Sequence, residues 1–178
     1  MGTISANFFM SLDGVVESPN LFVFPYFSDE VGAAVSASTE QSRAMIMGRQ
    51  LYAEWSAYWP TAEDPFGGFI NQVDKYVISD SLTTADWNAT TIIPGAEAEQ
   101  QVRALKERTD GVIGVSGSGT TVAWLATHRL LDELRLLVFP VAVGQGRRLF
   151  EDGRVPLALT GSRSLDTGVV ELVYAPAP

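Results

Sequence analysis

Five small and hydroxylated residues, 117–121, carry the clearest chemical signal in this sequence. The segment Gly117-Ser118-Gly119-Thr120-Thr121 follows a short apolar run typical of a buried strand and precedes residues 122–130, which are typical of a helix. Glycine permits close backbone approach, while hydroxyls and the unpartnered N–H groups of a helix start bind phosphate oxygens. The pattern indicates either a phosphate-binding loop or a tight turn without a ligand.

Two more predicted strands end in similar segments. Gly48 closes one apolar run and is followed by Arg49, a fixed cation that suits phosphate. Small polar residues, Ser79 and Asp80, follow the next run. Alone, each segment is as easily a solvent-exposed turn. Together they favour a site, because ligands of α/β sheets bind at the carboxyl ends of strands and one elongated anion can reach all three.

The hydrophobic pattern alternates between strand and helix. A near-continuous apolar run at 134–143 is typical of a central strand, and Asp166-Thr167-Gly168 predicts a turn between two strand-like runs. We expect an α/β fold in one domain over residues 1–178, with a central, mostly parallel sheet flanked by helices and a C-terminal antiparallel hairpin. Strands are predicted at 3–9, 44–47, 75–79, 90–93, 112–115 and 134–143, and helices after Ser28 and at 49–55, 96–108 and 122–130.

Composition excludes several classes of function. The chain has 178 residues, no cysteine and a formal charge of −9, so we expect neither disulfides nor thiolate chemistry nor the basic surface that nucleic acid needs. No apolar run approaches the length of a membrane span, and residues 1–14 predict a first strand rather than a signal peptide. The single histidine, His128, is predicted to face solvent, without a triad or metal partner. A cytoplasmic protein without a metal site is expected.

The order of six motifs resembles the dihydrofolate-reductase-like family. Within it, the chain is most similar to the branch of the C-terminal reductase domain of the bifunctional riboflavin-biosynthesis deaminase-reductase. The resemblance covers nearly the whole chain and is carried by residues 10–14 (MSLDG), 47–52 (MGRQLY), 75–79 (KYVIS), 115–119 (VSGSG), 131–134 (LDEL) and 140–150 (PVAVGQGRRLF).

The resemblance implies a dihydrofolate-reductase-like fold and a nicotinamide cofactor, NADPH. Residues 117–121 would hold its pyrophosphate, and Arg49 and Ser79 would face the adenosine 2′-phosphate. The turn at 11–16 would lie over the nicotinamide, where Asp13 is either catalytic or shapes the turn. The implied cofactor-binding residues are Gly48, Arg49, Gln50, Leu51, Ile78, Ser79, Asp80, Val115, Gly117, Ser118, Gly119, Thr120 and Thr121.

The departures from the family concern the substrate. Asn7 stands where the riboflavin reductases, which this chain resembles, carry a lysine. Ser116 stands where they tend to carry a glutamate, so two positions that are charged in those enzymes are neutral here. Asp29 and Glu30 lie near the place of the pterin-binding carboxylate of dihydrofolate reductases, although both also suit the first turn of a helix. The deaminase domain has no counterpart in this sequence.

Three functions remain open at this stage. The first is an oxidoreductase that passes a hydride from NADPH to a small unsaturated substrate, with heterocycles among the candidates. The second is a nucleotide-binding module without efficient turnover. The third is an assembly protein that uses its dense aromatic residues and retains only a vestigial cofactor site. Asp80 is expected to weaken the preference for NADPH over NADH, and the resemblance implies a homodimer.

Overall fold

A single mixed sheet organises the part of the chain that the computed structural model describes, residues 1–150 and 154–177. Its strand order is β4-β3-β2-β5-β1-β6-β8-β7. The first six strands run parallel, whereas β8 is antiparallel to β6 and β7 is antiparallel to β8. The strands are β1 (Thr3–Ser11), β2 (Ser42–Gly48), β3 (Asp74–Ile78), β4 (Thr90–Ile93), β5 (Val112–Val115), β6 (Glu133–Phe139), β7 (Leu157–Ser164) and β8 (Val170–Pro176).

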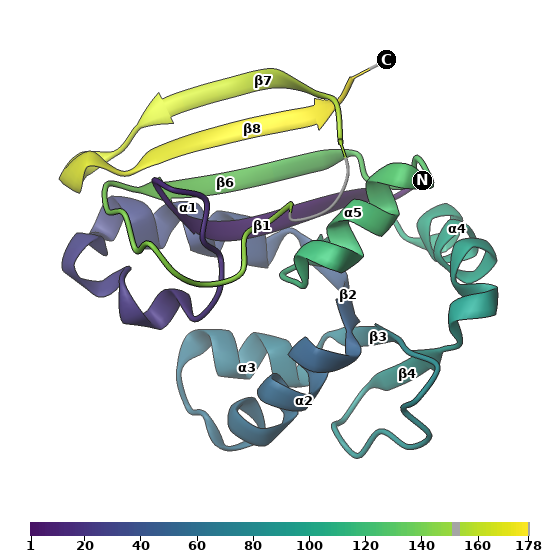
Figure 1. The fold of residues 1–178 in the computed structure, drawn as a ribbon. Helices are drawn as coiled ribbons and strands as arrows, with labels where there is room; N and C mark the ends of the chain where they lie inside the picture. Colours follow the sequence, from purple (N-terminus) through teal and green to yellow (C-terminus); the bar gives the residue numbers. More distant parts are fainter. Residues whose placement is uncertain (151–153, 178) are drawn as a thin grey trace.

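Helices cover both faces of the sheet (Figure 1). Apolar residues of α4 and α5 pack with Ile4, Ile46 and their neighbours on one face, whereas those of α1, α2 and α3 pack in two clusters against the other. The helices are α1 (Asp29–Glu40), α2 (Arg49–Tyr58), α3 (Pro65–Gln72), α4 (Ala98–Arg108) and α5 (Gly119–Thr127), with short 3-10 turns at Pro19–Leu21, Phe24–Tyr26, Trp59–Thr61, Gly95–Glu97 and Asp166–Gly168. Within the described ranges, none of these helices combines the length and the apolar character needed to cross a bilayer.

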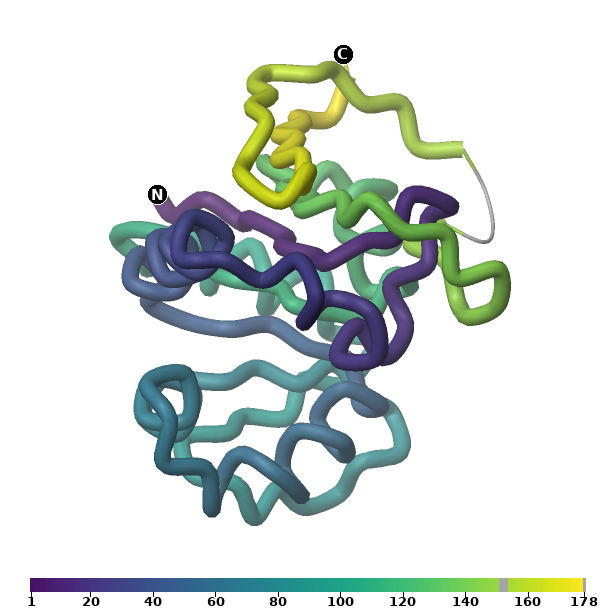
Figure 2. The backbone as a smooth tube through the Cα atoms, turned by 90° about the vertical axis from the view of Figure 1, so that its left-hand side faces the viewer, coloured from purple at the N-terminus to yellow at the C-terminus, as the bar shows by residue number. Residues whose placement is uncertain are grey.

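The two ends of the sheet are formed by different parts of the chain (Figure 2). The C-terminal hairpin of β7 and β8 forms one end, drawn in yellow, and the segment from α2 to β4 forms the other, drawn in blue to teal. Between them lie β5 and β1, the central strands, whose Val115, Ile4 and Ala6 are fully buried. The carboxyl ends of the central parallel strands therefore meet at one edge of the molecule.

The architecture confirms the predicted mostly parallel sheet and the C-terminal antiparallel hairpin. Ser28 caps α1 as predicted, because its hydroxyl accepts a hydrogen bond from the Val31 N–H at 3.2 Å. Several boundaries were wrong by two to four residues. The central strand β6 ends at Phe139 rather than at 143, since Pro140 has no N–H to continue the ladder, and α5 begins at Gly119 rather than at 122.

Helix α3 was not predicted, although its start carries a clear signal. Asp64 accepts a hydrogen bond from the Gly67 N–H at 3.0 Å, and Pro65 occupies the first helical position. The end of α3 is held by the fully buried Lys75, whose Nζ donates to the carbonyl oxygens of Ile70 at 2.7 Å and Val73 at 2.8 Å. Burial lowers the pKa of this lysine to about 8. Lys75 therefore ties the helix to β3.

Candidate functional site

The predicted cofactor residues meet where three neighbouring strands end. In the sheet register, Gly48 of β2 pairs with Ile78 of β3, and Ile46 of β2 pairs with Val115 of β5. Helix α2 starts directly after β2, and α5 starts after the three-residue segment 116–118 that follows β5, so their N-termini lie at the same edge. Sequence segments about 70 residues apart thus form one surface that exposes the N–H groups of two helix starts.

At the first junction, Gly48 is the N-cap of α2 and has no side chain to cap it. Its missing Cβ matters, because a carbon there would lie 3.0 Å from the Thr121 Oγ1 and 3.7 Å from the Ser118 Oγ. Arg49 follows at the surface, and no hydrogen bond or ion pair joins its side chain to any residue within 1–150 or 154–177. The junction therefore offers a positively charged group without a protein partner.

At the second junction, Ser118 is the N-cap of α5, and its hydroxyl oxygen lies 3.5 Å from that of Thr121. Helix geometry leaves the N–H groups of the first turn, from Gly119 to Thr121, without intrahelical acceptors. Thr120 is exposed at this start. Two hydroxyls and a helix N-terminus with its partial positive charge therefore face the first junction, an arrangement that suits an anion.

The two glycines of this loop are packed closely against other segments of the chain. A Cβ on Gly119 would overlap the carbonyl oxygen of Leu149, and a Cβ on Gly117 would lie 3.3 Å from the Leu51 Cδ2. Gly117 also has a φ of +152°, which favours glycine. Both glycines therefore accommodate neighbouring segments of this chain. These contacts account for both glycines without a ligand, and the expectation that the loop makes room for a pyrophosphate stays a prediction.

The third strand end faces a different neighbour. Ser79 holds its own turn, because its hydroxyl oxygen accepts hydrogen bonds from the N–H groups of Ser81 at 3.2 Å and Leu82 at 3.0 Å. Asp80 accepts a hydrogen bond from the Gly95 N–H at 2.7 Å, which joins it to the turn that follows β4. The Asp80 carboxylate, which was expected to weaken the preference for NADPH, therefore forms a hydrogen bond within the protein.

An open hollow of about 680 Å³ adjoins Arg49 on the outer side of α2. Tyr52 and Trp87 provide flat walls, and Ser81 and Leu82, which are held by Ser79, form part of its rim. The ring centroids of Tyr52 and Trp87 are 6.2 Å apart. Both rings are largely buried, so the hollow combines the Arg49 cation, which suits a phosphate, with only small parts of two aromatic surfaces, and Asp86 lines it as well.

Asp13 lies in the turn after β1, where the protein uses its whole carboxylate. Oδ1 accepts hydrogen bonds from the Ser11 hydroxyl at 2.6 Å and the Val143 N–H at 3.0 Å, and Oδ2 accepts one from the Gly144 N–H at 2.8 Å. The Ser11 hydroxyl, followed by the two N–H groups, holds the pKa of Asp13 well below its usual range. Asp13 therefore positions the segment that follows β6.

Arg147, Glu17 and Gln50 form a hydrogen-bonded group that was not predicted from the sequence. The Arg147 Nε donates to Glu17 at 2.9 Å, and its Nη1 donates to the Gln50 Oε1 at 2.7 Å. Gln50, predicted to line the cofactor path, thus links α2 to the loop after β6. Contacts that join residues 97 and 130 positions apart leave no periodic signal in a sequence.

The two neutral departures lie in different surroundings. Asn7 lies in the middle of β1 beside Arg135 of β6, and its amide nitrogen donates to the Ser5 carbonyl oxygen at 3.3 Å. Its Oδ1 is buried and has no hydrogen-bond donor among the described residues. Ser116 is half-buried between β5 and Gly117. Neither position places a charge near the site.

His128 caps the end of α5, away from these junctions. Its Nδ1 lies 2.8 Å from the Trp124 carbonyl oxygen, and its ring is tilted over that tryptophan. The ring is only partly exposed, so the prediction of a solvent-facing histidine was incomplete. Within the two described ranges, no group of three or more potential ligands could hold a metal ion.

Comparisons with known proteins agree with this fold. An uncharacterised protein of Bacillus subtilis (strain 168), YyaP, is 28% identical over 172 residues, which cover 93% of this chain and 90% of that protein. The crystal structure of a putative riboflavin biosynthesis protein from Shewanella sp. PV-4 superposes with a TM-score of 0.78 at 16% identity and 99% coverage of both chains.

A second similar structure is that of a dihydrofolate reductase. Dihydrofolate reductase from Enterococcus faecalis, in complex with NADP(H), superposes with a TM-score of 0.65 at 11% identity, covering 99% of this chain and 98% of that one. The chain therefore has the dihydrofolate-reductase-like α/β fold. The model of the RibD C-terminal domain matches residues 2–171. These residues are nearly the whole sequence, and the chain therefore belongs to the RibD C-terminal domain family, a family of reductase domains.

Proposed function

We propose that this protein is an NADPH-dependent reductase that transfers a hydride to a small unsaturated substrate, with heterocycles among the candidates. The observation that carries the proposal is the meeting of two helix N-termini at the ends of β2 and β5, beside the unpartnered Arg49. Membership in a family of reductase domains supports the same reading. The residues present fit a dinucleotide, which needs two anionic groups recognised some distance apart.

Each part of the cofactor has a candidate partner in this arrangement. The N–H groups at the start of α5, with the hydroxyls of Ser118 and Thr121, would donate hydrogen bonds to the pyrophosphate. Arg49 would pair with the 2′-phosphate, and the hollow beside Tyr52 and Trp87 would take the adenosine end. Both Asp80 and Ser79 already bond to the protein, so we assign them to shaping that end rather than to recognising it.

When bound, a reduced nicotinamide supplies the hydride, and the protein supplies binding, orientation and exclusion of water. The turn at 11–16 is fixed over the carboxyl end of β1 by Asp13 and by the Leu12 N–H, which donates to the Val141 carbonyl oxygen at 2.8 Å. This turn would form a rigid wall at the nicotinamide end. Asp13 would keep its negative charge there and orient the wall, without transferring a proton.

The second candidate function is dinucleotide binding without efficient turnover. The state of Asp13 favours it, because the single carboxylate predicted for the reaction end accepts three hydrogen bonds from the protein and has a depressed pKa. An enzyme of this geometry would need its proton from water or from the substrate. Turnover separates the two functions, since both require binding.

The test is a calorimetric titration with NADPH and NADH, followed by a turnover screen at the absorbance of the reduced cofactor. We expect binding of both, with the preference for NADPH within about tenfold, roughly 1.4 kcal/mol. The screen pairs unsaturated heterocycles and enones with the ribosylamino pyrimidine of riboflavin biosynthesis. We expect no useful rate with the latter, because Asn7 and Ser116 are neutral. Binding without turnover of any acceptor would favour the second function, and absence of binding would overturn both.

A further inference from the structure

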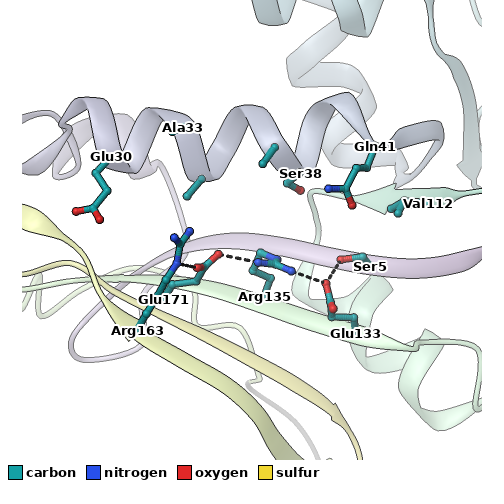
Figure 3. A pocket seen from close by; sticks show the side chains of 12 residues that line it. Ser5, Glu30, Ala33, Ser38, Gln41, Val112, Glu133, Arg135, Arg163 and Glu171 are labelled. Atoms are coloured by element: carbon teal, nitrogen blue, oxygen red, sulfur yellow. Dashed lines mark hydrogen bonds and ion pairs between the residues drawn. The ribbon is translucent and has the colours of Figure 1, made fainter.

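A second polar cavity lies away from the cofactor edge, between α1 and the sheet (Figure 3). Its volume is about 280 Å³, the space of roughly nine water molecules at ~30 Å³ each. Ser5 and Glu133 lie in the sheet opposite the end of α1, where Gln41 follows the helix. Ser5 is six residues before the carboxyl end of β1, so this part of the cavity lies roughly 20 Å along the strand from the cofactor edge.

The cavity exists because α1 presents small side chains to a charged part of the sheet. Ala33, Ala34, Ala37 and Ser38 line the helix side and leave the space unfilled. On the sheet side, four charged residues of three strands form a continuous network that ends at Ser5. Arg163 of β7 pairs with Glu171 of β8, Glu171 with Arg135 of β6, and Arg135 with Glu133 of β6.

Most of the polar atoms in this network already have partners. Glu171 is 3% exposed, and burial opposes its ionisation, yet the two arginines hold its pKa below the ordinary value. Glu133 accepts from the Arg135 Nη2 at 3.2 Å and from the Ser5 hydroxyl at 2.9 Å. The network centre is therefore a fixed, charged floor that a ligand does not need to complete.

At one end of the cavity, Arg163 and Glu30 each have polar atoms without a hydrogen-bond partner among the described residues. Arg163 uses only its Nε, so its two terminal nitrogens have no hydrogen-bond acceptor among the described residues. Glu30 uses only its Oε2, which accepts from the Asp166 N–H at 2.6 Å. Over the described ranges, no ion pair within 4.0 Å joins Glu30 to Arg163, although both line the same space. Each is anchored by another contact, so opposite charges are held apart.

This separation selects the charge of an occupant. The cavity is lined by three glutamates and two arginines, so a simple anion meets repulsion from the carboxylates and a simple cation meets the guanidinium groups. A small molecule that carries both charges can form charge-assisted hydrogen bonds with both side chains, through a carboxylate to Arg163 and an ammonium group to Glu30. It adds no net charge to a partly buried site.

We propose that the cavity under α1 is a second binding site, which takes a small zwitterion of the α-amino-acid class. Its carboxylate is bound by the terminal nitrogens of Arg163 and its ammonium group by Glu30. A short apolar side chain packs along Ala33 and Ala37. Because Glu30 and Arg163 are exposed at the mouth, binding is weak, with a dissociation constant in the millimolar range.

The test is a titration of the ¹⁵N-labelled full chain, followed by NMR, with three matched compounds at constant ionic strength: L-alanine, L-alanine methyl ester, which is only a cation, and N-acetyl-L-alanine, which is only an anion. We expect L-alanine to shift the amide signals of residues 30–41 and 161–166 in a saturable manner, and not those of residues 117–121. The ester and the acetylated compound should bind at least tenfold more weakly.

Two variants and one control test the assignment. Ala37→Leu fills the cavity, and Glu30→Gln removes the charge but keeps an acceptor for the Asp166 N–H; each should weaken L-alanine binding at least tenfold. Ser36→Leu adds the same side chain to an exposed position of α1 that does not line the cavity, and should bind as the wild type does. The proposal is overturned by unsaturable or absent shifts, by equal binding of the three compounds, or by undiminished binding in Ala37→Leu and Glu30→Gln.

Discussion

The two strand–glycine–helix junctions look alike in sequence but differ in what surrounds their glycines. At the β2–α2 junction, the absent Cβ of Gly48 leaves space for the hydroxyl of Thr121, and the next residue is a cation without a protein partner. At the β5–α5 junction, Gly117 and Gly119 are packed against Leu51 and the backbone of Leu149. A glycine-rich loop can thus be required by the fold even where a ligand is expected.

The largest effect is expected for the packed glycine. In Gly119→Ala, the added methyl group meets the Leu149 carbonyl oxygen, so the free energy of unfolding should fall by about 1–3 kcal/mol. Urea unfolding followed by circular dichroism measures it. The matched control is Gly68→Ala in α3, where a Cβ meets nothing within 4 Å and the same substitution should stabilise by about 0.5–1 kcal/mol.

The contact between a Cβ at position 119 and Leu149 also limits which substitutions can test residues 117–121 as a phosphate-binding loop. A carboxylate at position 119 would reduce cofactor affinity through the same clash with Leu149, so Gly119→Asp cannot report on the ligand alone. If Gly119→Ala proves as stable as the wild type, the close approach of residues 149 and 119 does not exist in solution, and the two junctions are more alike than we conclude.

The next effect concerns the free cation. Arg49→Ala should reduce the affinity for NADPH about tenfold, because a charge-assisted contact with the 2′-phosphate is lost, and should leave NADH binding nearly unchanged. Calorimetry with both cofactors measures the ratio. Asp80→Ala is the control, since Asp80 bonds to Gly95 and should not alter the preference. An unchanged NADPH/NADH ratio in Arg49→Ala would contradict this placement of the adenosine end.

A smaller and different effect is expected for Thr121→Val, which keeps the shape of a nearly buried side chain and removes its hydroxyl. Affinity should fall about fivefold, the ~1 kcal/mol of an ordinary hydrogen bond. Because the pyrophosphate is common to both cofactors, NADPH and NADH should lose equally. A loss confined to NADPH would assign Thr121 to the 2′-phosphate instead and reverse the roles of the two junctions.

The smallest effect at neutral pH is expected for Asp13, in the turn after β1. The depressed pKa of Asp13 means that its hydrogen bonds stabilise the fold fully above about pH 4 and that this contribution is lost as the pH falls towards the lower folded-state pKa. Acid unfolding of Asp13→Asn should therefore show a shallower pH dependence. The pH profile of the cofactor oxidation rate should contain no step due to Asp13 between pH 5 and 9. A pH-dependent change in that range that Asp13→Asn abolishes would contradict our assignment.

Much of the fold could be predicted because its signals are local. Apolar runs gave the central strands, and Ser28 and the turn at 166–168 marked a helix start and a hairpin. Helix α3 was missed even though Asp64-Pro65 is a good start signal, because its sequence is short and rich in glycine and aromatic residues, which are weak helix formers. The length of β6 was overestimated because the apolar pattern continues beyond Pro140.

The site was predictable only in outline. Which strand ends meet follows from sheet order, but the partners of Asp13, Asp80 and Gly119 come from contacts with residues far away in the sequence. The charged network under α1 left no pattern in the sequence, since its four members are spread over three strands. The homodimer stays a prediction, and light scattering that returns the 19.2 kDa monomer mass at micromolar concentration would contradict it.

The most direct test of the central claim is a titration of the ¹⁵N-labelled protein with NADPH, observed through its amide signals. The account predicts saturable shifts for the first turns of α2 and α5, residues 49–51 and 119–121, because their N–H groups would bind the two anionic parts of the cofactor. Shifts confined to other segments, or no saturable shift at millimolar NADPH, would contradict it.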